Sequence, residues 1–486
     1  MKVQFEQLFI YELNTRIFCK ENSCTLDTFP EKFFLSKEFQ ACDYLWLMGI
    51  WMPSQKSKAI CDTHEGLQKE FHKALPDLTN SDIVGSPYAI YLYEPNPLVA
   101  ASFEEIKRFR EKIHTFGKKL ILDFVPNHLA VDTPLISENP NYFLQGDNLS
   151  YSHNFFLHSN GKYFAHGRDP YFDGWTDTIQ WDFSNPDVLE LHISIIQKIS
   201  DVSDGVRCDM AMLPEEKIFQ KTHGKRALPY WKPLIEKIKS KQKDFLFIAE
   251  VYWGMEYELQ LKGFDFTYDK ELYDRMKTHT LEIYSHLQAD LSYQRHSLRF
   301  IENHDEIRAM EAFGGKSIHF FGVLAFLQGI VLYHDGQTTG KFKKLPVQLG
   351  RRDKEEIPLQ IQNFYNRALD AIVFRKNRIH YIEKCTVFSY CEIEFSNTVA
   401  YCLLEKKELN PKVELLIYNP YNTQIKGRFN LPTIVHSYIE LHKTDEVQLT
   451  DIVDGQVYMK RKTELRENDV FFELRENQTH WFVMNL

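Results

Sequence analysis

The chain has 486 residues, of which 43% are hydrophobic and 26% are charged, a composition typical of a folded globular protein. This length exceeds what one small core needs and predicts two or three structural units. The net charge of −9 argues against a nucleic-acid partner, because binding to phosphates requires concentrated Lys and Arg, and it fits a neutral substrate.

The N-terminal residues and the cysteines carry no targeting or metal-binding signal. Residues 1–6 show no basic segment before a long apolar run, so no signal peptide is expected. No uncharged apolar stretch is long enough to span a membrane, so no membrane partner is expected. None of the eight cysteines stands in a Cys-x-x-Cys pair, which excludes the usual zinc and redox motifs. We interpret them as reduced thiols of a cytoplasmic protein of unknown oligomeric state. The cysteines are Cys19, Cys24, Cys42, Cys61, Cys208, Cys385, Cys391 and Cys402.

Short apolar runs alternate with amphipathic helices through the first three quarters of the chain. Strands that are buried on both faces form continuous apolar runs rather than alternating patterns, and several of these segments do so. The eight predicted strands cover residues 8–18, 44–50, 120–128, 205–211, 245–251, 264–268, 299–305 and 330–334.

The clearest predicted helix covers residues 102–116. Ser102 and Glu105 fit a capping box at its start, and Gly117 can end it. Its apolar residues recur on one face, as expected for a helix packed on a core. That face consists of Ile106, Phe109, Ile113 and Phe116. Similar patterns predict helices over residues 188–199 and 231–238.

The repeated strands and helices predict an α/β fold. Eight strand–helix repeats favour a (β/α)8 TIM barrel over the structural alternative, a doubly wound open sheet. We favour the barrel because polar motifs recur at the C-terminal ends of several strands. Residues 129–183, after strand 3, interrupt the repeat, and their many Asn, Gly, His and aromatic residues predict an inserted domain.

The pattern changes again after residue 380. Short β-type segments separated by Asn, Pro and Gly turns predict a C-terminal antiparallel β-sandwich over residues 381–486. The barrel domain, with its insert, then covers residues 1–380. The predicted C-terminal strands include residues 413–419, 448–452, 457–460 and 480–484.

Four of the predicted barrel strands end in polar residues that a purely structural strand would avoid. A buried carboxylate is costly unless it is paired or used. Because the C-terminal ends of barrel strands meet at one face, we expect these side chains to converge. The segments are 122–128 with Asp123, 205–210 with Arg207 and Asp209, 247–252 with Glu250, and 300–305 with Asp305.

The chemistry of these residues suits cleavage of a glycosidic bond. Arg207 and Asp209 lie two residues apart on one strand, so their side chains point the same way, and the guanidinium favours an ionised Asp209. Glu250 follows an apolar run, and burial is expected to raise its pKa and retain its proton. An acid can then protonate the departing oxygen while a carboxylate attacks the anomeric carbon. Asp305, beside His304, can hold sugar hydroxyls and stabilise positive charge. Taken alone, Arg207 and Asp209 could be a structural ion pair.

In this order, and on predicted strands three, four, five and seven, the four segments resemble the conserved regions of the α-amylase family of glycoside hydrolases. The resemblance extends to about residue 380, and the C-terminal β-domain matches the family's layout. Residues 129–183 would be the family's domain B. The resemblance implies a retaining enzyme that cleaves or transfers at α-glucosidic bonds of an α-glucan or maltooligosaccharide through a covalent glycosyl-enzyme. It implies no required cofactor.

Matched residue by residue, the resemblance implies that Asp209 is the nucleophile, Glu250 the general acid/base and Asp305 the transition-state stabiliser. It also implies an aromatic platform, a supporting carboxylate and further groups around the sugar in subsite −1. These substrate-binding residues are Tyr88, Asp123, His128, Arg207 and His304.

Asn127 resembles a residue that is often linked to structural calcium in this family. Asp169, Asp173 and Asp177 lie nearby in the insert and are candidate ligands. No acidic loop with regular calcium-binding spacing occurs, so the sequence does not support a calcium requirement.

Two features leave the reaction type open. Many starch-cleaving members carry Lys-His three and four positions after the nucleophile, where this chain has Met212 and Leu213. This change leaves room for a glucanotransferase, an isomerase or an oligosaccharide hydrolase. We predict transfer of the glycosyl unit to a sugar acceptor at the apolar surface of Met212 and Leu213. Residues 345–352 (Leu-Pro-Val-Gln-Leu-Gly-Arg-Arg) resemble a bacterial branch of the family whose activity is open.

The alternative from a different functional class is a catalytically inactive sugar-binding or regulatory protein on the same barrel. Such proteins typically lack one or more of the catalytic carboxylates. Asp209, Glu250 and Asp305 are all present here, which favours the enzyme.

Overall fold

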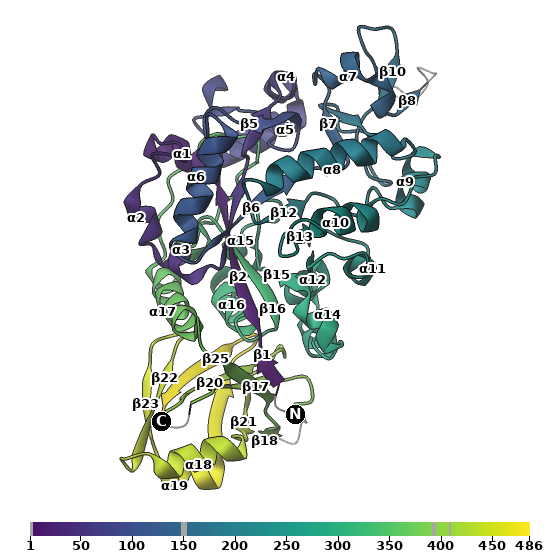
Figure 1. Cartoon of the computed structure of the whole chain (residues 1–486). Helices are drawn as coiled ribbons and strands as arrows, with labels where there is room; N and C mark the ends of the chain where they lie inside the picture. Colours follow the sequence, from purple (N-terminus) through teal and green to yellow (C-terminus); the bar gives the residue numbers. More distant parts are fainter. Residues whose placement is uncertain (1–2, 147–152, 391–394, 408–409) are drawn as a thin grey trace.

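The computed structural model describes residues 3–146, 153–390, 395–407 and 410–486, and Cys391 lies outside these ranges. Eight parallel strands close into a barrel in the order β2-β3-β6-β12-β13-β14-β15-β16 (Figure 1). The closed barrel confirms the predicted fold and excludes the open sheet. The barrel strands are β2 (Gln7–Asn14), β3 (Tyr44–Met48), β6 (Lys119–Phe124), β12 (Gly205–Cys208), β13 (Leu246–Ala249), β14 (Phe266–Tyr268), β15 (Ser297–Arg299) and β16 (Gly329–His334).

Several barrel strands end earlier than the sequence predicts. The strand predicted over residues 8–18 ends at Asn14, and the strand predicted over 299–305 ends at Arg299. Ile301, which follows β15, is fully buried although it pairs with no neighbouring strand. The buried apolar run thus continues past the point where ladder pairing stops.

Helix α6 (Phe103–His114) matches the clearest helix prediction but departs from it at both ends. Ser102 Oγ accepts from the Glu105 N–H at 3.3 Å, as predicted. The Glu105 carboxylate accepts from the Ala101 N–H at 2.7 Å rather than from the Ser102 N–H, so only half of the capping box forms. Phe116, predicted on the buried face, lies beyond the helix and is 38% exposed.

The other predicted helices correspond to α8 and α10. Together with α6, the α-helices in the described part of the first 375 residues are α1 (Thr15–Asn22), α2 (Glu31–Phe34), α3 (Lys37–Ala41), α4 (Gln55–Thr63), α5 (Glu65–Ala74), α7 (Leu135–Glu138), α8 (Pro186–Ser200), α9 (Glu216–His223), α10 (Trp231–Lys239), α11 (Glu256–Leu261), α12 (Lys270–Thr278), α13 (Ile283–His286), α14 (Leu291–Arg295), α15 (Ala309–Phe313), α16 (Ser317–Leu324) and α17 (Leu359–Arg375).

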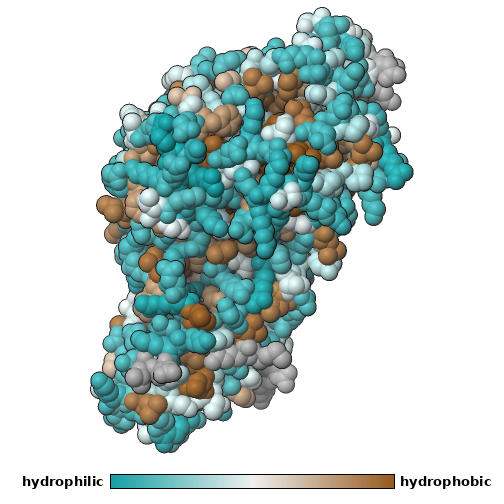
Figure 2. Space-filling model, in the orientation of Figure 1, coloured by the Kyte–Doolittle hydropathy of each residue, from teal (hydrophilic) through white to brown (hydrophobic). Residues whose placement is uncertain are grey.

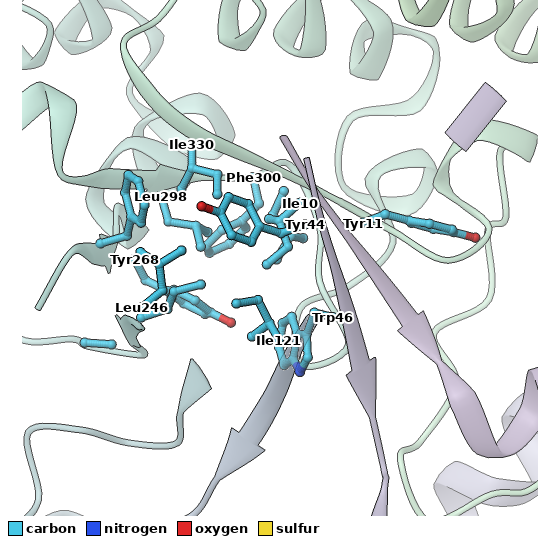
Figure 3. Close-up of a cluster of buried hydrophobic side chains, with 14 of the residues drawn as sticks. Ile10, Tyr11, Tyr44, Trp46, Ile121, Leu246, Tyr268, Leu298, Phe300 and Ile330 are labelled. Atoms are coloured by element: carbon cyan, nitrogen blue, oxygen red, sulfur yellow. The ribbon is translucent and has the colours of Figure 1, made fainter. Parts of the chain in front are cut away.

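Apolar side chains from the strands fill the barrel. Figure 3 shows Ile10, Ile121, Leu246, Leu298 and Ile330 gathered in one cluster, and all are buried. These residues come from β2, β6, β13, β15 and β16, so the cluster ties distant strands together. A packed interior of this kind leaves the polar groups to the C-terminal face.

The insert after the third barrel strand is a small β-structure of its own. Strand β7 (His128–Ala130) pairs with β11 (Thr178–Gln180), and a three-stranded sheet lies beyond them. Trp181 stacks on Phe143 with ring centroids 4.5 Å apart, which gives the insert an aromatic core. The three-stranded sheet consists of β8 (Gln145–Gly146), β9 (Phe155–Leu157) and β10 (Tyr163–Ala165), and a separate pair, β4 (Trp51–Pro53) and β5 (Ile90–Pro95), lies between β3 and β6 in the chain.

The C-terminal part is a β-sandwich at the opposite end of the molecule from the insert (Figure 1). A seven-stranded sheet, β1-β17-β19-β20-β25-β22-β23, faces a three-stranded sheet, β18-β21-β24. The N-terminal strand β1 belongs to the larger sheet, so both ends of the chain lie in it. The predicted boundary at residue 380 stays a prediction. The elements are β1 (Val3–Phe5), β17 (His380–Lys384), β18 (Val387–Ser389), β19 (Val399–Glu405), β20 (Lys412–Tyr418), β21 (Ile425–Phe429), α18 (Thr433–Leu441), β22 (Glu446–Asp451), β23 (Val457–Arg461), α19 (Lys462–Asn468), β24 (Val470–Leu474) and β25 (Thr479–Asn485).

On the face shown in Figure 2, hydrophilic side chains predominate and hydrophobic ones form small scattered groups. Across the described ranges, no helix combines the length and the apolar character that a bilayer span requires.

Candidate active site

The carboxyl groups predicted from the sequence meet at the C-terminal face of the barrel. Asp123 lies on β6 and Arg207 on β12, while Asp209 and Glu250 come directly after β12 and β13. Strand β12 pairs in parallel with both β6 and β13, which brings these three strand ends together. Asp305 reaches the same place from the loop after β15.

Arg207 is fully buried and contacts all four carboxyl groups. Its Nη1 lies 2.8 Å from Asp209 Oδ1 and 3.4 Å from Asp123 Oδ1. Its Nη2 lies 2.7 Å from Glu250 Oε2 and 3.9 Å from Asp305 Oδ2. A buried charge is tolerated when it is paired in this way, and the planar guanidinium fixes the positions of the carboxyl groups relative to one another.

Both side-chain oxygens of Glu250 are held in place. Oε2 accepts from the Met210 backbone N–H at 2.7 Å, and Oε1 accepts from the Tyr252 hydroxyl at 2.7 Å. Burial raises the pKa of Glu250 to about 7, against the opposing effect of Arg207. A carboxyl group that keeps its proton near neutral pH can donate it to a leaving group.

Asp209 stands at a sharp turn. Met210 has a left-handed backbone conformation (φ 42°), which aims its N–H at Glu250. Burial raises the pKa of Asp209, whereas the Arg207 guanidinium favours the ionised form and opposes that shift. The sequence predicts that Arg207 favours an ionised Asp209. In the structure this effect of Arg207 is opposed by the burial of the same carboxyl group.

His304 links Asp305 to Glu12, a fully buried residue of β2 that the sequence interpretation missed. His304 Nε2 lies 2.8 Å from Asp305 Oδ2, and its Nδ1 pairs with Glu12. Burial would lower the pKa of His304, but Asp305 and Glu12 together raise it well above its usual value. Desolvation would likewise raise the pKa of Asp305, although its side chain is 44% exposed, but the charged His304 outweighs this effect and lowers that pKa. Asp305 is therefore held as a carboxylate.

Tyr88 and His128 lie on the walls of the site. The Tyr88 hydroxyl lies 2.7 Å from His304 Nε2, and the two rings stack with centroids 5.3 Å apart. His128, at the start of β7, packs against Trp175 with centroids 5.2 Å apart. Burial lowers the pKa of His128 to about 4, so its ring is neutral at pH 7 and can exchange hydrogen bonds with a neutral ligand.

Asp123 lies beneath the site rather than on its wall. It accepts from Trp46 Nε1 at 3.2 Å and contacts Arg207, and burial raises its pKa to about 6. Above it, a cavity of about 560 Å³ falls within the size range of small-molecule sites. Its polar and aromatic lining includes Tyr88, His128, Trp175, Asp209, Glu250, Tyr252, Asp305 and Gln348.

The predicted acceptor surface at Met212 and Leu213 is wrong. These residues are 0% and 2% exposed, and neither lines the cavity. Both side chains lie inside the protein, because burying apolar surface is more favourable than exposing it to the water of the cavity. Met210 itself lines the cavity.

Three oxygen atoms near the predicted calcium position accept hydrogen bonds within the protein. Asn127 Oδ1 accepts from Gln180 Nε2 at 3.0 Å. Asp169 Oδ1 accepts from two backbone N–H groups, and Asp177 Oδ2 accepts from the Ser57 hydroxyl at 2.6 Å. Within the described ranges, no three His, Cys, Asp or Glu side chains gather closely enough to hold a metal ion. The absence of a calcium requirement stays a prediction.

We therefore expect a calcium chelator to leave the thermal midpoint of unfolding unchanged. The reason is that the Asn127 amide is satisfied within the protein, so removal of an ion would free no bond. Differential scanning calorimetry with chelator, and again after added calcium, measures this. A midpoint that drops by several degrees and returns with calcium would contradict the expectation.

We expect Tyr252→Phe to move the alkaline limb of the pH–rate profile to higher pH. The Tyr252 hydroxyl donates to the charged form of Glu250 and so lowers its pKa. Without it Glu250 keeps its proton to higher pH, by about half to one pH unit for a typical hydrogen bond. The matched control is Tyr257→Phe, because Tyr257 is exposed, and this variant should leave the alkaline limb where it is. An unmoved limb in the Tyr252 variant would contradict this role.

Two sequence relatives match parts of the chain, although no family model matches it. Over 261 residues, or 51% of its length, the chain is 24% identical to the α-amylase MalA of Haloarcula japonica. Over 120 residues, or 22% of its length, it is 28% identical to the cyclomaltodextrin glucanotransferase of a Bacillus species. The matched parts span 34% and 16% of these two relatives.

Solved structures match over the full length. The maltogenic α-amylase AmyB of Thermotoga neapolitana superposes with a TM-score of 0.65 at 19% identity, and the match covers 99% of both chains. The α-amylase of H. orenii gives a TM-score of 0.65 at 16% identity over 99% of both chains. The chain therefore has the fold of α-amylases. The same fold occurs in the trehalose-6-phosphate hydrolase TreA of Bacillus licheniformis, with a TM-score of 0.62 at 12% identity, so the α-amylase fold alone does not define the substrate.

Two residues of this site were not predicted from the sequence. Glu12 is a charged residue inside an apolar strand, and the argument applied to the other strand carboxylates would have found it. Tyr252 gave no such signal, because a tyrosine after a buried strand is an ordinary core residue.

Proposed function

We propose that this protein cleaves or transfers at α-glucosidic bonds with retention, through a covalent glycosyl-enzyme. Asp209 attacks the anomeric carbon, and Glu250 protonates the departing oxygen and later removes a proton from the acceptor. Asp305 holds the sugar hydroxyls and opposes the positive charge that develops on the ring. The substrate is an α-glucan or a maltooligosaccharide, as the names of the relatives suggest.

One observation carries this proposal. A single guanidinium binds Asp209 through Nη1 at 2.8 Å and Glu250 through Nη2 at 2.7 Å, so both carboxyl groups face one cavity. Burial raises the pKa of Asp209 and Arg207 opposes that shift by favouring its charged form, while Glu250, with a pKa of about 7, keeps a proton near neutral pH. Retaining glycosidases need such a pair, one carboxyl group charged and the other protonated. Nothing observed favours the inactive alternative, because no catalytic carboxylate is missing or displaced.

The test is product analysis with a panel of substrates. The purified protein is incubated with maltooligosaccharides, trehalose, sucrose and glycogen, and the products are separated by chromatography while their anomeric form is followed by NMR. We expect products of the α configuration from at least one substrate. Longer oligomers that appear early at high substrate concentration would indicate transfer, and shorter products alone would indicate hydrolysis. Products of the β configuration would contradict the proposal.

The predicted location and partners stay predictions. A cytoplasmic location was inferred from the scattered cysteines, and fractionation of source cells tests it. The absence of a nucleic-acid partner was inferred from the net charge, and a binding titration with mixed oligonucleotides tests it.

A further inference from the structure

A second cavity of about 560 Å³, which we call the Arg16 cavity, lies between α1, the start of α4 and the segment before Tyr88. Its lining includes Arg16, Lys20, Lys58 and Asn96. Among the described residues, it shares no lining residue with the catalytic cavity. Its volume falls within the range of small-molecule sites, so a ligand could bind here without occupying the place of the reaction.

The charged residues that line the Arg16 cavity are all cations. They are Arg16, Lys20 and Lys58, and no described Asp or Glu is among the lining residues. This is unusual for a chain with a net charge of −9. Like charges that converge on one cavity repel one another and attract an anion.

The carboxylates next to this cavity in the sequence already have other partners. Glu21, beside Lys20, pairs with Arg352 at 2.8 Å, and Asp82 pairs with Arg351 at 2.9 Å. In the part of the chain that the structure describes, no carboxylate pairs with the three cations of the cavity. Their charge therefore remains unbalanced.

Arg16 is the buried member of this group. Its side chain is 5% exposed, its Nη1 donates to Gly85 O at 3.0 Å, and its Nη2 donates to Val347 O. Both acceptors are neutral carbonyls, and Nε finds no acceptor among the described residues. Burial lowers the pKa of Arg16 to about 10, so it is still charged at pH 7. A buried cation without a counter-ion is costly, and a bound anion would offset that cost.

The neutral groups around the cavity also favour an anion. Asn96 is 2% exposed, and its Nδ2 donor lacks a partner among the described residues. Gln55, which also lines the cavity, is the first residue of α4 and so lies at the positive end of the helix dipole. Burial raises the pKa of the Cys19 and Cys24 thiols, so both are neutral and do not oppose an anion.

The number of cations favours a phosphate over a carboxylate. At pH 7 a phosphate monoester carries about −1.5 to −2 charges, whereas a carboxylate carries one. Lysine binds phosphate as a compact charge on a flexible stem, which suits Lys20 and Lys58. The cavity also has apolar lining residues, among them Val84 and Leu98, which can contact the organic part of a small ligand.

We propose that the Arg16 cavity binds a small phosphate monoester, with Lys20 and Lys58 around the phosphate group and Arg16 as a buried counter-charge. This ligand site lies apart from the catalytic cavity, and the inference does not rest on the proposed function. Arg16 also holds Gly85 in the segment before Tyr88, so the site adjoins a wall of the catalytic cavity.

The first test is calorimetric titration of the full chain at low ionic strength with glycerol 3-phosphate, glycerate and glycerol. We expect glycerol 3-phosphate to bind at one site. Glycerate, with less charge, should bind about three- to tenfold more weakly, and glycerol should not bind detectably. If glycerol 3-phosphate does not bind, or if glycerate binds equally well, the inference is wrong.

The second test locates the binding. We expect the double variant Lys20→Met with Lys58→Met to raise the Kd of glycerol 3-phosphate about tenfold or more, the usual effect of losing charged hydrogen bonds. The control that loses the same charge is Lys56→Met with Lys69→Met, because both residues are exposed and neither lines the cavity. Thermal midpoints establish that both proteins are folded. An unchanged Kd in the first variant, or an equal loss in the control, would overturn the inference.

Discussion

The Asp209→Asn protein is expected to fold normally and to lose turnover by a factor on the order of 10⁴ or more, as when other covalent enzymes lose their nucleophile. The amide has nearly the same shape as the carboxylate but cannot form the bond to the anomeric carbon. Arg207 also loses its partner at 2.8 Å, so its charge remains balanced only by the other carboxyl groups. Initial rates on the substrate found by product analysis measure the loss.

The matched control for this variant is Asp201→Asn, because Asp201 is exposed after α8 and lies outside the cavity. It should keep the wild-type rate. Circular dichroism and the thermal midpoint establish that both variants are folded. A folded Asp209→Asn protein with a rate near wild type would show that Asp209 is not the nucleophile.

The second large effect is expected for Glu250→Gln and depends on the leaving group. On a natural oligosaccharide we expect a loss of about 10²- to 10⁴-fold, the usual contribution of a positioned acid. An activated aryl glycoside needs little protonation of its departing oxygen, so its first step should slow by less than about tenfold. Single-turnover measurements on both substrates test this difference, and equal losses on both would contradict the role of Glu250.

The pH dependence gives an independent check on Glu250. Its pKa of about 7 means that the acid form predominates below pH 7 and disappears as the pH rises through that value. The wild-type rate on the natural substrate should therefore fall above about pH 7, and this limb should be absent from Glu250→Gln. The exposed Glu258 in α11, changed in Glu258→Gln, is the control that should keep the limb.

Local sequence patterns were sufficient to predict the barrel and its carboxyl groups. Continuous apolar runs indicated the strands. Asp123, Asp209 and Glu250 were predicted as site residues because a carboxylate at the end of a buried strand is costly unless it is paired or used. Strand pairing then brought these residues to one face without any further information. The ends of the strands were less predictable, because a residue such as Ile301 is buried although it has no ladder partner.

Features that depend on contacts between distant segments could not be predicted. Gln348 reaches the cavity only because its loop pairs with residues near Val84, far away in the chain. Met212 and Leu213 were predicted at the site but do not reach it. They lie close to the nucleophile in sequence, but after the turn at Met210 both side chains are buried. The direction of a side chain after a sharp turn is not encoded in spacing alone.

The most direct test of the covalent mechanism is mass spectrometry of the protein after reaction with a fluorinated α-glucosyl fluoride. The good leaving group allows the first step, whereas the ring fluorine slows release of the sugar, so the intermediate accumulates. The account predicts a mass increase of one fluorinated glucosyl unit, located on the peptide that contains Asp209 and absent from Asp209→Asn. A label on a different residue, or products of the β configuration without any labelled protein, would contradict it.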